Sequence, residues 1–420
     1  MSDIVEKHGV TNDPAEIQVA TSSVEVPSYR PKQTIGQLLR NDLGFLPILL
    51  TLILVLVFFE FVTGGLFLSP QNVSNLIQQV ASLGIFSVGI VLVLLLGEID
   101  LSAAAVGMLS SVVMAVLAER HGMPALPAIL LSLLAGLICG LVNGFFVSIL
   151  NIPSFIVTLA TFIIASGASL FFLGTQTTQL ITNPTILSIS GTAVSYFTNV
   201  LGVGLPLIAV LLYVFSTFYT YQRRRKAGLS TMPPARLIIQ SVVAIVVVMG
   251  VIALLQNYDG VPYSTGILFG VILLVWLMLT RTSYGRHIYA VGGNLEAARR
   301  AGINITAIRL SVFALCSLIA ALAQIVETSR ENAISSNLPS MLQLDIIAAA
   351  VIGGVSLFGG KGSVWAVVLG MLIVEALDNG LSLLGQTSDV KQMVEGAVLI
   401  LAVTADALIR RSQARSKSGR

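Results

Sequence analysis

The stretch YGRHIYAVGGNLEAARRAGI, residues 284–303, is a polar segment between two long apolar runs of the chain. Asn294 is a favourable N-cap residue, because its side chain can accept a hydrogen bond from a free backbone N–H group at a helix start. Glu296 falls in the first turn and Arg299 in the last, where each charge complements the helix dipole. Gly302 suits the left-handed position that follows a helix. These residues predict a short helix of about two turns.

This predicted helix needs a partner surface, because an isolated helix of about two turns is marginal in water. Ala297 and Ala298 are small enough to let another surface approach the helix closely. One interpretation is a docking helix for a cytoplasmic protein, with Arg286 and Gly293 in the same loop. The other is a solvated basic loop beside the membrane, and the residues alone leave both open.

The composition is that of a membrane protein. The chain has 420 residues, of which 55% are hydrophobic and 10% charged, whereas soluble domains carry about 25% charged residues. Apolar runs near the length of a membrane-spanning helix recur along the chain, and the alternating pattern of membrane β-strands is absent. The twelve predicted apolar segments are 45–63, 80–97, 102–118, 125–149, 153–173, 200–221, 236–255, 264–280, 308–326, 345–357, 364–384 and 394–409.

We therefore expect an all-α polytopic membrane protein with about 10–12 transmembrane helices. Segment 345–357 is the weakest of the twelve and is expected to be re-entrant or one half of a broken helix. Cys139 and Cys316 both lie inside apolar segments, so they indicate neither a disulfide framework nor a metal cluster.

The positions of Lys and Arg predict the orientation. With the N-terminus in the cytoplasm and alternating spans, every Lys and Arg lies on the cytoplasmic side except Arg120, Arg330 and Lys391. Cytoplasmic loops are the ones enriched in these residues. Both termini are therefore expected in the cytoplasm, with an even number of spans.

Three parts of the chain are expected. Residues 1–44 form a polar cytoplasmic tail without the hydrophobic core of a signal peptide. Residues 45–409 form the membrane domain, in which residues 281–307 are a cytoplasmic loop. Residues 410–420 form a basic cytoplasmic tail.

Two connections are unusually short and carry neither Lys nor Arg: GEIDLS, residues 97–102, and NIPS, residues 151–154. Pro153 disfavours a helical conformation at the residue before it. Both segments are therefore interpreted as helix breaks. Because both segments are short and contain no Lys or Arg, we expect them to lie close to the 281–307 loop and to move with it.

A weak internal similarity links the two halves of the chain. Asp100 precedes Leu-Ser-Ala-Ala-Ala-Val, and Asp345 precedes Ile-Ile-Ala-Ala-Ala-Val. Each is followed further on by Asn-Gly, at Asn143 and at Asn379. Repeated halves with a site at their interface are common in transporters. An internal repeat and a chance coincidence of Ala-rich helices are both compatible with this pattern.

Acidic side chains inside membrane segments are the candidates for a polar path, because an Asp at a helix centre costs about 2.5–3.5 kcal/mol to insert. Amides and hydroxyls near the predicted breaks and the outer helix ends complete the set. Alternatives remain for several of them: an N-cap for Asp100, bonds between helices for Asp378 and Asn379, and ordinary packing for Phe155. The candidate path residues are Asn72, Glu98, Asp100, Ser154, Phe155, Thr158, Asp345, Asp378 and Asn379, with Glu375 beside them.

Nucleotide hydrolysis by this chain is not expected. The nearest candidate for a phosphate-binding loop, GVSLFGGKGS, has Val355 at the first required glycine and Gly362 where Ser or Thr is required. His8, His121 and His287 are isolated from one another, which argues against a zinc site or a histidine-based catalytic set. No metal and no nucleic-acid partner is expected.

Taken together, four segments resemble the permease subunits of bacterial ABC sugar importers of the ribose and xylose type. They are the loop GRHIYAVGGNLEAARRAGI, GEIDLS, IPSFIVTLAT (152–161) and LDIIAAAVIGGVSLFGGKGSV (344–364), followed by LDNGLSLLG (377–385). The resemblance runs in order from about residue 72 to residue 406. Residues 200–255 form an insertion of two apolar spans that the xylose-type permeases share, so the chain is most similar to those.

The resemblance implies a type II-like importer permease fold in which two copies form the pathway. The 284–303 segment would be the coupling loop, with Arg286, Gly293, Asn294, Glu296, Ala297, Ala298, Arg299 and Gly302 facing the ATPase. ATP and Mg²⁺ would be used by that partner and not bound by this chain. A periplasmic binding protein would deliver a neutral pentose, foremost D-xylose, across the bacterial inner membrane.

Three other functions compete with this prediction. The first is a permease of the same family for another monosaccharide: ribose, arabinose or galactose. An ion-coupled secondary transporter would need a coupling acid and no ATPase, and the docking-type helix argues against it. A membrane-embedded enzyme would need a clustered catalytic set, which the sequence does not offer.

Overall fold

The computed structural model describes residues 46–191, 195–229, 233–337 and 341–398, with residues 400 and 404. Nine helices in these residues are long and apolar enough to cross a membrane, which confirms the predicted all-α polytopic architecture. They are α3 (Pro70–Leu95), α4 (Ala103–Ala115) with the π-helical η1 (Val116–Arg120), α5 (Ala125–Ser148), α6 (Ser154–Leu173), α8 (Asn199–Lys226), α9 (Pro234–Gln256), α10 (Tyr263–Arg281), α13 (Ile305–Glu331), and η2 (Val364–Ala366) with α15 (Val367–Leu383).

Shorter elements connect and flank these helices. Two strand pairs are antiparallel, β1 with β4 and β2 with β3, and residues 388–398 are also helical. The shorter elements are α2 (Leu46–Val62), β1 (Thr178–Leu180), α7 (Pro184–Leu187), β2 (Tyr196–Phe197), β3 (Val261–Pro262), α11 (Ser283–Gly293), α12 (Leu295–Arg300), β4 (Ala333–Ser335) and α14 (Leu342–Ile352). The predicted tails, 1–44 and 410–420, lie outside the described residues.

Helix α3 is the central helix of the bundle and begins ten residues before the predicted apolar segment 80–97. Ser69 is its N-cap and accepts a hydrogen bond from the backbone N–H of Asn72, with Pro70 at the first helical position. A proline there sacrifices no helical hydrogen bond. In its most apolar 18-residue window, 89% of the residues are buried. Hydropathy alone missed the first turns because they are polar and are packed inside protein.

Helix α14 corresponds to segment 345–357, the weakest of the predicted spans. It has 11 residues, which at about 1.5 Å per residue span roughly half of an apolar bilayer core. Irregular backbone follows from Gly353 until η2. The helix itself packs against α3 and α15, whereas the irregular backbone after it is partly exposed, at Gly354, Phe358, Lys361 and Ser363.

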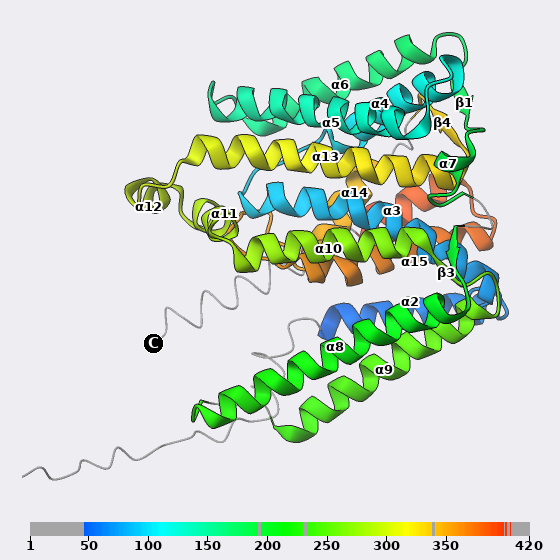
Figure 1. Ribbon diagram of the computed structural model, residues 1–420, viewed down its shortest axis with the longest axis vertical. Helices are drawn as coiled ribbons and strands as arrows, with labels where there is room; N and C mark the ends of the chain where they lie inside the picture. The colour runs from blue at the N-terminus through cyan, green and yellow to red at the C-terminus, as the bar shows by residue number, and fades with distance from the viewer. Residues whose placement is uncertain are drawn as a thin grey trace, which may run out of the picture. The chain divides into compact units, whose positions relative to one another are not determined.

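The long helices are arranged around α3 and α13 (Figure 1). Helix α13 packs against α3 on one side and against α4 and α5 on the other, and α6 packs on α4. Helices α10, α14 and α15 pack against α3, and α2 packs against α15. The main core is therefore built around the buried length of α3.

A stripe of small residues brings α5 and α13 close together. Gly136, Gly140 and Gly144 are spaced four residues apart on one face of α5. A Cβ atom at Gly140 would lie 2.6 Å from the carbonyl oxygen of Phe313, and one at Gly144 would lie 2.8 Å from Cα of Leu310. Such small-residue faces let membrane helices approach backbone to backbone.

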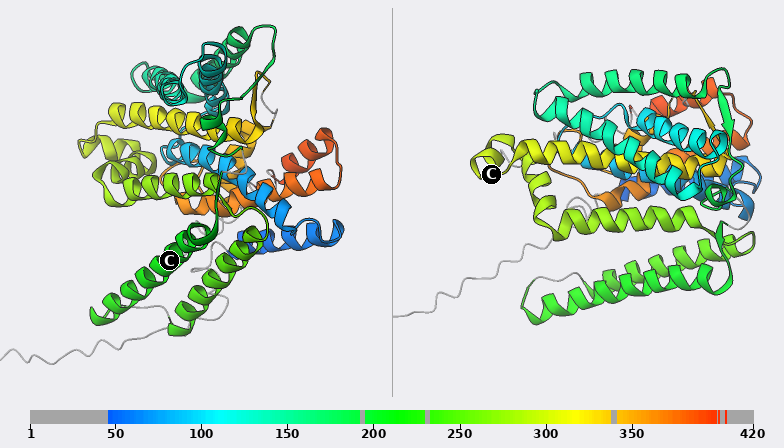
Figure 2. Two further views of the ribbon diagram at one scale, coloured as in Figure 1. Left: turned by 45° about the vertical axis from the view of Figure 1, so that its right-hand side comes forward. Right: turned by 45° about the horizontal axis from the view of Figure 1, so that its top comes forward.

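The predicted insertion 200–255 forms the hairpin α8–α9 at the margin of the bundle (Figure 2). Only 11% of the residues in the apolar window of either helix are buried. Helix α8 packs on α9, and α9 has further contacts with α3. The hairpin therefore contributes little to the core.

The bundle has two ends. The α12 end carries α11, α12 and the turns at Gly97 and Gly359. The β4 end carries β4, α7 and the start of α3, on the right in Figure 1.

Candidate coupling helix and polar cluster

The predicted short helix is present as α12. The Asn294 side chain accepts a hydrogen bond from the backbone N–H of Ala297 at 2.9 Å. At the other end Gly302 has φ +78°, and its N–H donates to the carbonyl of Arg299. The N–H of Ile303 donates to the carbonyl of Ala298, which completes a Schellman motif. Both caps are local, which is why the sequence predicted the helix correctly.

Helix α12 is anchored by one small side chain and presents the rest of its surface outward. Ala298 is 3% exposed, whereas Glu296, Ala297 and Arg299 are exposed. The Arg299 guanidinium forms an ion pair with Glu296 on the exposed face, at 2.9 Å. This short helix therefore offers a charged surface with small residues, as a docking helix requires.

Helix α11 directly precedes α12 and is held by contacts of its own. The Thr282 side chain caps its start by accepting from the N–H of Gly285. Arg286 is exposed and donates to the Ser283 hydroxyl at 2.8 Å. The Tyr289 hydroxyl donates to the carbonyl of Gly362 at 2.9 Å, and burial raises the pKa of Tyr289, so this phenol stays a neutral donor.

Three turns meet backbone to backbone where α11 ends, and we call this contact the glycine junction. It consists of Gly97, Gly292, Gly359 and Gly360. A Cβ atom at Gly292 would lie 1.8 Å from the carbonyl oxygen of Leu95, and one at Gly359 would lie 2.7 Å from the carbonyl oxygen of Gly292. The N–H of Gly360 donates to the carbonyl of Leu95 at 2.9 Å. Side chains would separate these turns, so the glycines are required by the close approach.

Glu98 lies at the α12 end and has a charged partner. Its carboxylate accepts from the Arg309 guanidinium at 2.8 Å, and the two side chains are 14% and 19% exposed. Arg309 lies in the second turn of α13, shortly after α12. The predicted proximity of the 97–102 break to the coupling loop is confirmed, and Glu98 contributes to that contact.

The second predicted break packs directly on the first. The Ser154 hydroxyl accepts from the N–H of Ile99 at 3.2 Å, and the Thr158 hydroxyl accepts from the N–H of Leu101 at 3.0 Å. Phe155 is 51% exposed on the same helix, so it does not join these contacts. Ser154 and Thr158 therefore satisfy backbone donors of the non-helical 97–102 segment.

Asp100 is buried just before α4, with 1% of its surface exposed. Its Oδ1 accepts from the N–H and from the hydroxyl of Ser102, at 2.7 and 2.6 Å. Ser102, not Asp100, is the N-cap residue of α4. Asp100 is therefore not the N-cap that the sequence suggested: it lies two residues before the cap and stabilises the turn that precedes the helix.

Buried polar side chains connect this turn to the helices around it. The Asn143 amide donates to the Ser102 hydroxyl at 2.9 Å and accepts from Thr161 at 2.6 Å. From α14, the Gln343 amide accepts from the N–H of Ala104 at 2.8 Å and donates to the carbonyl of Asp100 at 3.1 Å. Four helices therefore meet at the 97–102 break.

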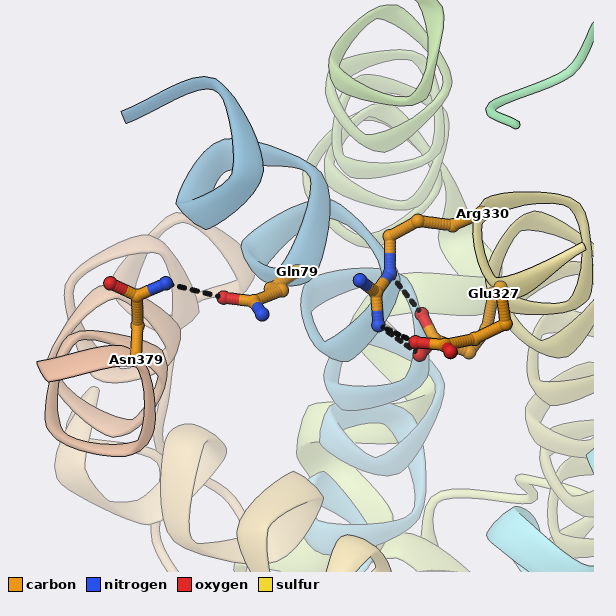
Figure 3. Close-up of polar contacts among 5 residues, drawn as sticks. Gln79, Glu327, Arg330 and Asn379 are labelled. Carbon is orange, nitrogen blue, oxygen red and sulfur yellow. Dashed lines mark hydrogen bonds and ion pairs between the residues drawn. The ribbon is translucent and has the colours of Figure 1, made fainter. Parts of the chain in front are cut away.

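A second polar group, which we call the β4-end cluster, comprises Gln79, Glu327, Arg330, Asp345, Glu375, Asp378, Asn379 and Lys391. Figure 3 shows the Gln79–Asn379 and Glu327–Arg330 pairs on either side of α3. The Asn379 amide donates to Gln79 at 3.1 Å, and Arg330 forms an ion pair with Glu327 at 2.7 Å. Asp345, Glu375 and Asp378 interact electrostatically with one another.

Further contacts tie the start of α3 to this cluster. The Asn72 amide donates to the Asn379 side chain and to the carbonyl of Phe67, both at 2.8 Å. Lys391 forms an ion pair with Asp378 at 3.0 Å. The predicted residues Asn72, Asp345, Asp378 and Asn379 are thus brought together, whereas Glu98, Asp100, Ser154 and Thr158 form the separate group at the 97–102 break.

The three basic residues that the charge rule left outside all lie at the β4 end. Arg120 donates to the carbonyl of Leu173 at the end of α6, beside β1. Arg330 and Lys391 belong to the β4-end cluster. This placement, opposite to α12, agrees with the charge pattern from which the orientation was predicted.

The two polar groups contain residues that the sequence analysis did not single out. Arg330 and Glu327 are spaced three residues apart at the end of an apolar run, a signal for an ion pair on one helix face. Arg309 was counted only as a loop charge, and Gln343 carried no signal, because its partners are more than 200 residues away in sequence.

Comparison with known proteins agrees with this architecture. Residues 72–403 match the family model described as branched-chain amino acid transport system / permease component. The chain is 37% identical to the xylose transport system permease protein XylH of Escherichia coli (strain K12) over 360 residues, covering 86% of this chain and 91% of the relative.

Two further relatives are similar over most of their length. XylH of Haemophilus influenzae is 36% identical over 362 residues, which cover 85% of this chain and 94% of the relative. The fructose import permease protein FrcC of Rhizobium meliloti is 30% identical over 397 residues, 94% of each chain. No solved structure matches the chain.

The family match covers most of the chain, and the nine long apolar helices agree with it. The motifs at 97–102, 152–161 and 344–364 indicated the same family from sequence. The chain is a multi-pass membrane protein that belongs to this family of transport-system permease components.

Proposed function

We propose that this chain is the membrane-spanning subunit of an ATP-driven importer that moves a pentose, foremost D-xylose, across the bacterial inner membrane. The observation that carries the proposal is α12, a helix capped at both ends, anchored through Ala298 and otherwise exposed. A permease that hydrolysed nothing itself would need such a surface to receive the motion of an ATPase. The similarity to xylose permeases supports the choice of substrate.

The proposed assembly contains two copies of this chain, two ATPase subunits and a sugar-binding protein outside. ATP and Mg²⁺ bind to the ATPase subunits, which dock on α12 with Arg286, Glu296, Ala297 and Arg299. In this orientation the α12 end and both termini face the cytoplasm. The β4 end receives the binding protein.

The β4-end cluster is the proposed entry of the sugar path. A neutral sugar is recognised through its hydroxyl groups, which donate to carboxylates and exchange hydrogen bonds with amides. Asn379, Gln79 and Asn72 supply amides, and Asp378 and Asp345 supply carboxylates. Because ATP provides the energy, these acids need no proton relay.

One relative is named a fructose import permease, so a monosaccharide other than D-xylose is the alternative substrate. Uptake of labelled D-xylose by proteoliposomes, with D-ribose, L-arabinose, D-galactose and D-fructose as competitors, decides between them. D-xylose should be transported with the highest ratio of maximal rate to KM. A higher ratio for a different sugar would reassign the substrate while leaving the importer proposal intact.

The importer proposal is tested on α12 itself. The purified chain is reconstituted with its ATPase and binding protein, and compared with the double variant Glu296→Arg, Ala297→Arg. The matched control is Gln222→Arg, Ala227→Arg, which changes two exposed positions at the end of α8. The α12 variant should lose ATPase co-elution and stimulated hydrolysis, whereas the control should retain both.

A secondary transporter would behave differently. Sugar uptake that needs no ATPase and is driven by an ion gradient would overturn the importer proposal. Equal losses in the α12 variant and in the α8 control would show that added charge, rather than α12, disturbs the complex.

A further inference from the structure

The 97–102 segment is non-helical backbone between α3 and α4, and side chains hold it from two directions. Toward the α12 end, Glu98 is paired with Arg309 at 2.8 Å. Toward the bundle interior, Gln343 bonds to the carbonyl of Asp100 and to the N–H of Ala104. The segment therefore links the start of α13 with the start of α14.

The link to α12 is short, and both helix ends beside it are capped. The Schellman motif at Gly302 ends α12, and the Asn304 side chain caps α13 by accepting from Ala307. Few residues lie between the two caps, so a displacement of α12 is passed to the first turns of α13. Arg309 is in those turns and carries the displacement to Glu98.

The link from the segment to the β4-end cluster passes through α14. Gln343 and Asp345 lie in the first turn of this helix. Gln343 faces the 97–102 break, and Asp345 lies near enough to Asp378 of the cluster for their like charges to repel each other. Helix α14 is also held to α3 by a bond from the Ser87 hydroxyl to the carbonyl of Ile346, at 3.1 Å.

Gln343 is suited to this position by its amide group. One side chain supplies both an acceptor for the N–H of Ala104 and a donor for the carbonyl of Asp100. It therefore joins the break to the first turn of α4 and is 9% exposed. A carboxylate would lack the donor, and an apolar side chain would leave both backbone groups without a partner.

We infer that Gln343 is a positioning residue for transport: it makes α14, and with it Asp345, follow the 97–102 segment when α12 moves. The inference rests on the proposed importer function. It assigns to Gln343 a role in coupling, not a direct contact with the sugar or with nucleotide.

The test uses the reconstituted complex with binding protein and D-xylose. Gln343→Met keeps the length of the side chain and removes both hydrogen bonds, Gln343→Glu keeps the acceptor only, and Gln222→Met is the exposed control. The measured quantity is sugar transported per ATP hydrolysed. We expect this ratio to fall about tenfold for Gln343→Met, with a smaller fall for Gln343→Glu and no change for the control, a tenfold change corresponding to about 1.4 kcal/mol of coupling.

The outcomes separate the two proposals. A wild-type ratio in Gln343→Met overturns the inference, and so does a parallel fall of transport and hydrolysis, which indicates a purely structural role. If Gln343→Met does not assemble, Gln343→Glu decides, and a wild-type ratio there also overturns the inference. A wild-type complex that transports sugar without ATP would instead refute the proposed function, and the inference with it.

Discussion

Neighbouring acids in the 97–102 segment have different partners, although their sequence context looks alike. Glu98 is paired with the Arg309 cation, whereas Asp100 accepts hydrogen bonds from Ser102 and has neutral neighbours. The first contact joins the 97–102 segment to helix α13, and the second shapes a turn before a helix. A position-by-position reading of acids in membrane segments cannot distinguish these two uses.

The Glu98–Arg309 pair should contribute to the stability of the chain. Glu98→Arg or Arg309→Glu alone leaves like charges in a partly buried site, and each should destabilise the protein by about 3 kcal/mol. The double variant should recover much of the loss, because the pair forms again with reversed polarity. Thermal unfolding of the purified chain in detergent measures this.

The exposed pair Glu296–Arg299 provides the control. Its side chains are 63% and 62% exposed, so reversing both charges should change stability by about 1 kcal/mol or less. If the double variant of Glu98 and Arg309 is no more stable than either single variant, the buried pair is not the source of the effect.

Asn379 should affect transport more than folding if the β4-end cluster lines the sugar path. Asn379→Ala removes the side-chain amide that donates to Gln79 and accepts from Asn72. Loss of one sugar contact of about 1.4 kcal/mol should raise the KM for D-xylose about tenfold. Asn75→Ala, an exposed change on the same helix as Asn72, should leave the KM unchanged. Equal KM values for both variants would exclude Asn379 from the path.

At the scale of elements, close packing between helices depends on where glycines fall. Gly140 of α5 faces the backbone of α13, whereas Gly167 of α6 has no atom within 4 Å of an added Cβ. Both are glycines in apolar helices, and the sequence treats them alike. The partner helix makes one of them necessary and leaves the other free.

Gly140→Ala should therefore be destabilising and Gly167→Ala should not. A Cβ at Gly140 would lie 2.6 Å from the Phe313 carbonyl oxygen, and overpacking of this kind costs about 1–3 kcal/mol. Alanine at Gly167 should be neutral or stabilise α6 by up to about 1 kcal/mol. Equal melting temperatures for the two variants would show that α5 and α13 can separate without loss.

At the scale of the whole molecule, the α8–α9 hairpin is the most separable part of the described chain. Each helix buries 11% of the residues in its apolar window. The residues that flank the hairpin are already paired, with Phe197 of β2 opposite Val261 of β3. Two paired strand residues can be joined by a two-residue turn.

Replacing residues 198–260 by Asn-Gly should therefore leave a folded permease. The shortened protein loses the packing of Leu255 on Val73, and this loss should lower its stability by about 2 kcal/mol. We expect a monodisperse protein with a modestly lower melting temperature, and retained ATP-dependent sugar uptake. Aggregation of this variant would show that the hairpin stabilises the bundle or its assembly.

Local patterns in the sequence determined the membrane class, the helix breaks and α12. Apolar runs predict spans through composition alone, and the caps of α12 are contacts between residues at most five positions apart. Such interactions need no knowledge of the rest of the chain. The family resemblance was likewise carried by short motifs.

Only the tertiary structure decided which polar residues meet. The glycine junction, the Glu98–Arg309 pair and the bonds of Gln343 all join segments that are far apart in sequence. In an apolar interior a polar group is stable only with a partner, and the partner is chosen by the packing of helices. For that reason the sequence identified polar candidates such as Asp345 and Asn379, but their grouping into two sites required the fold.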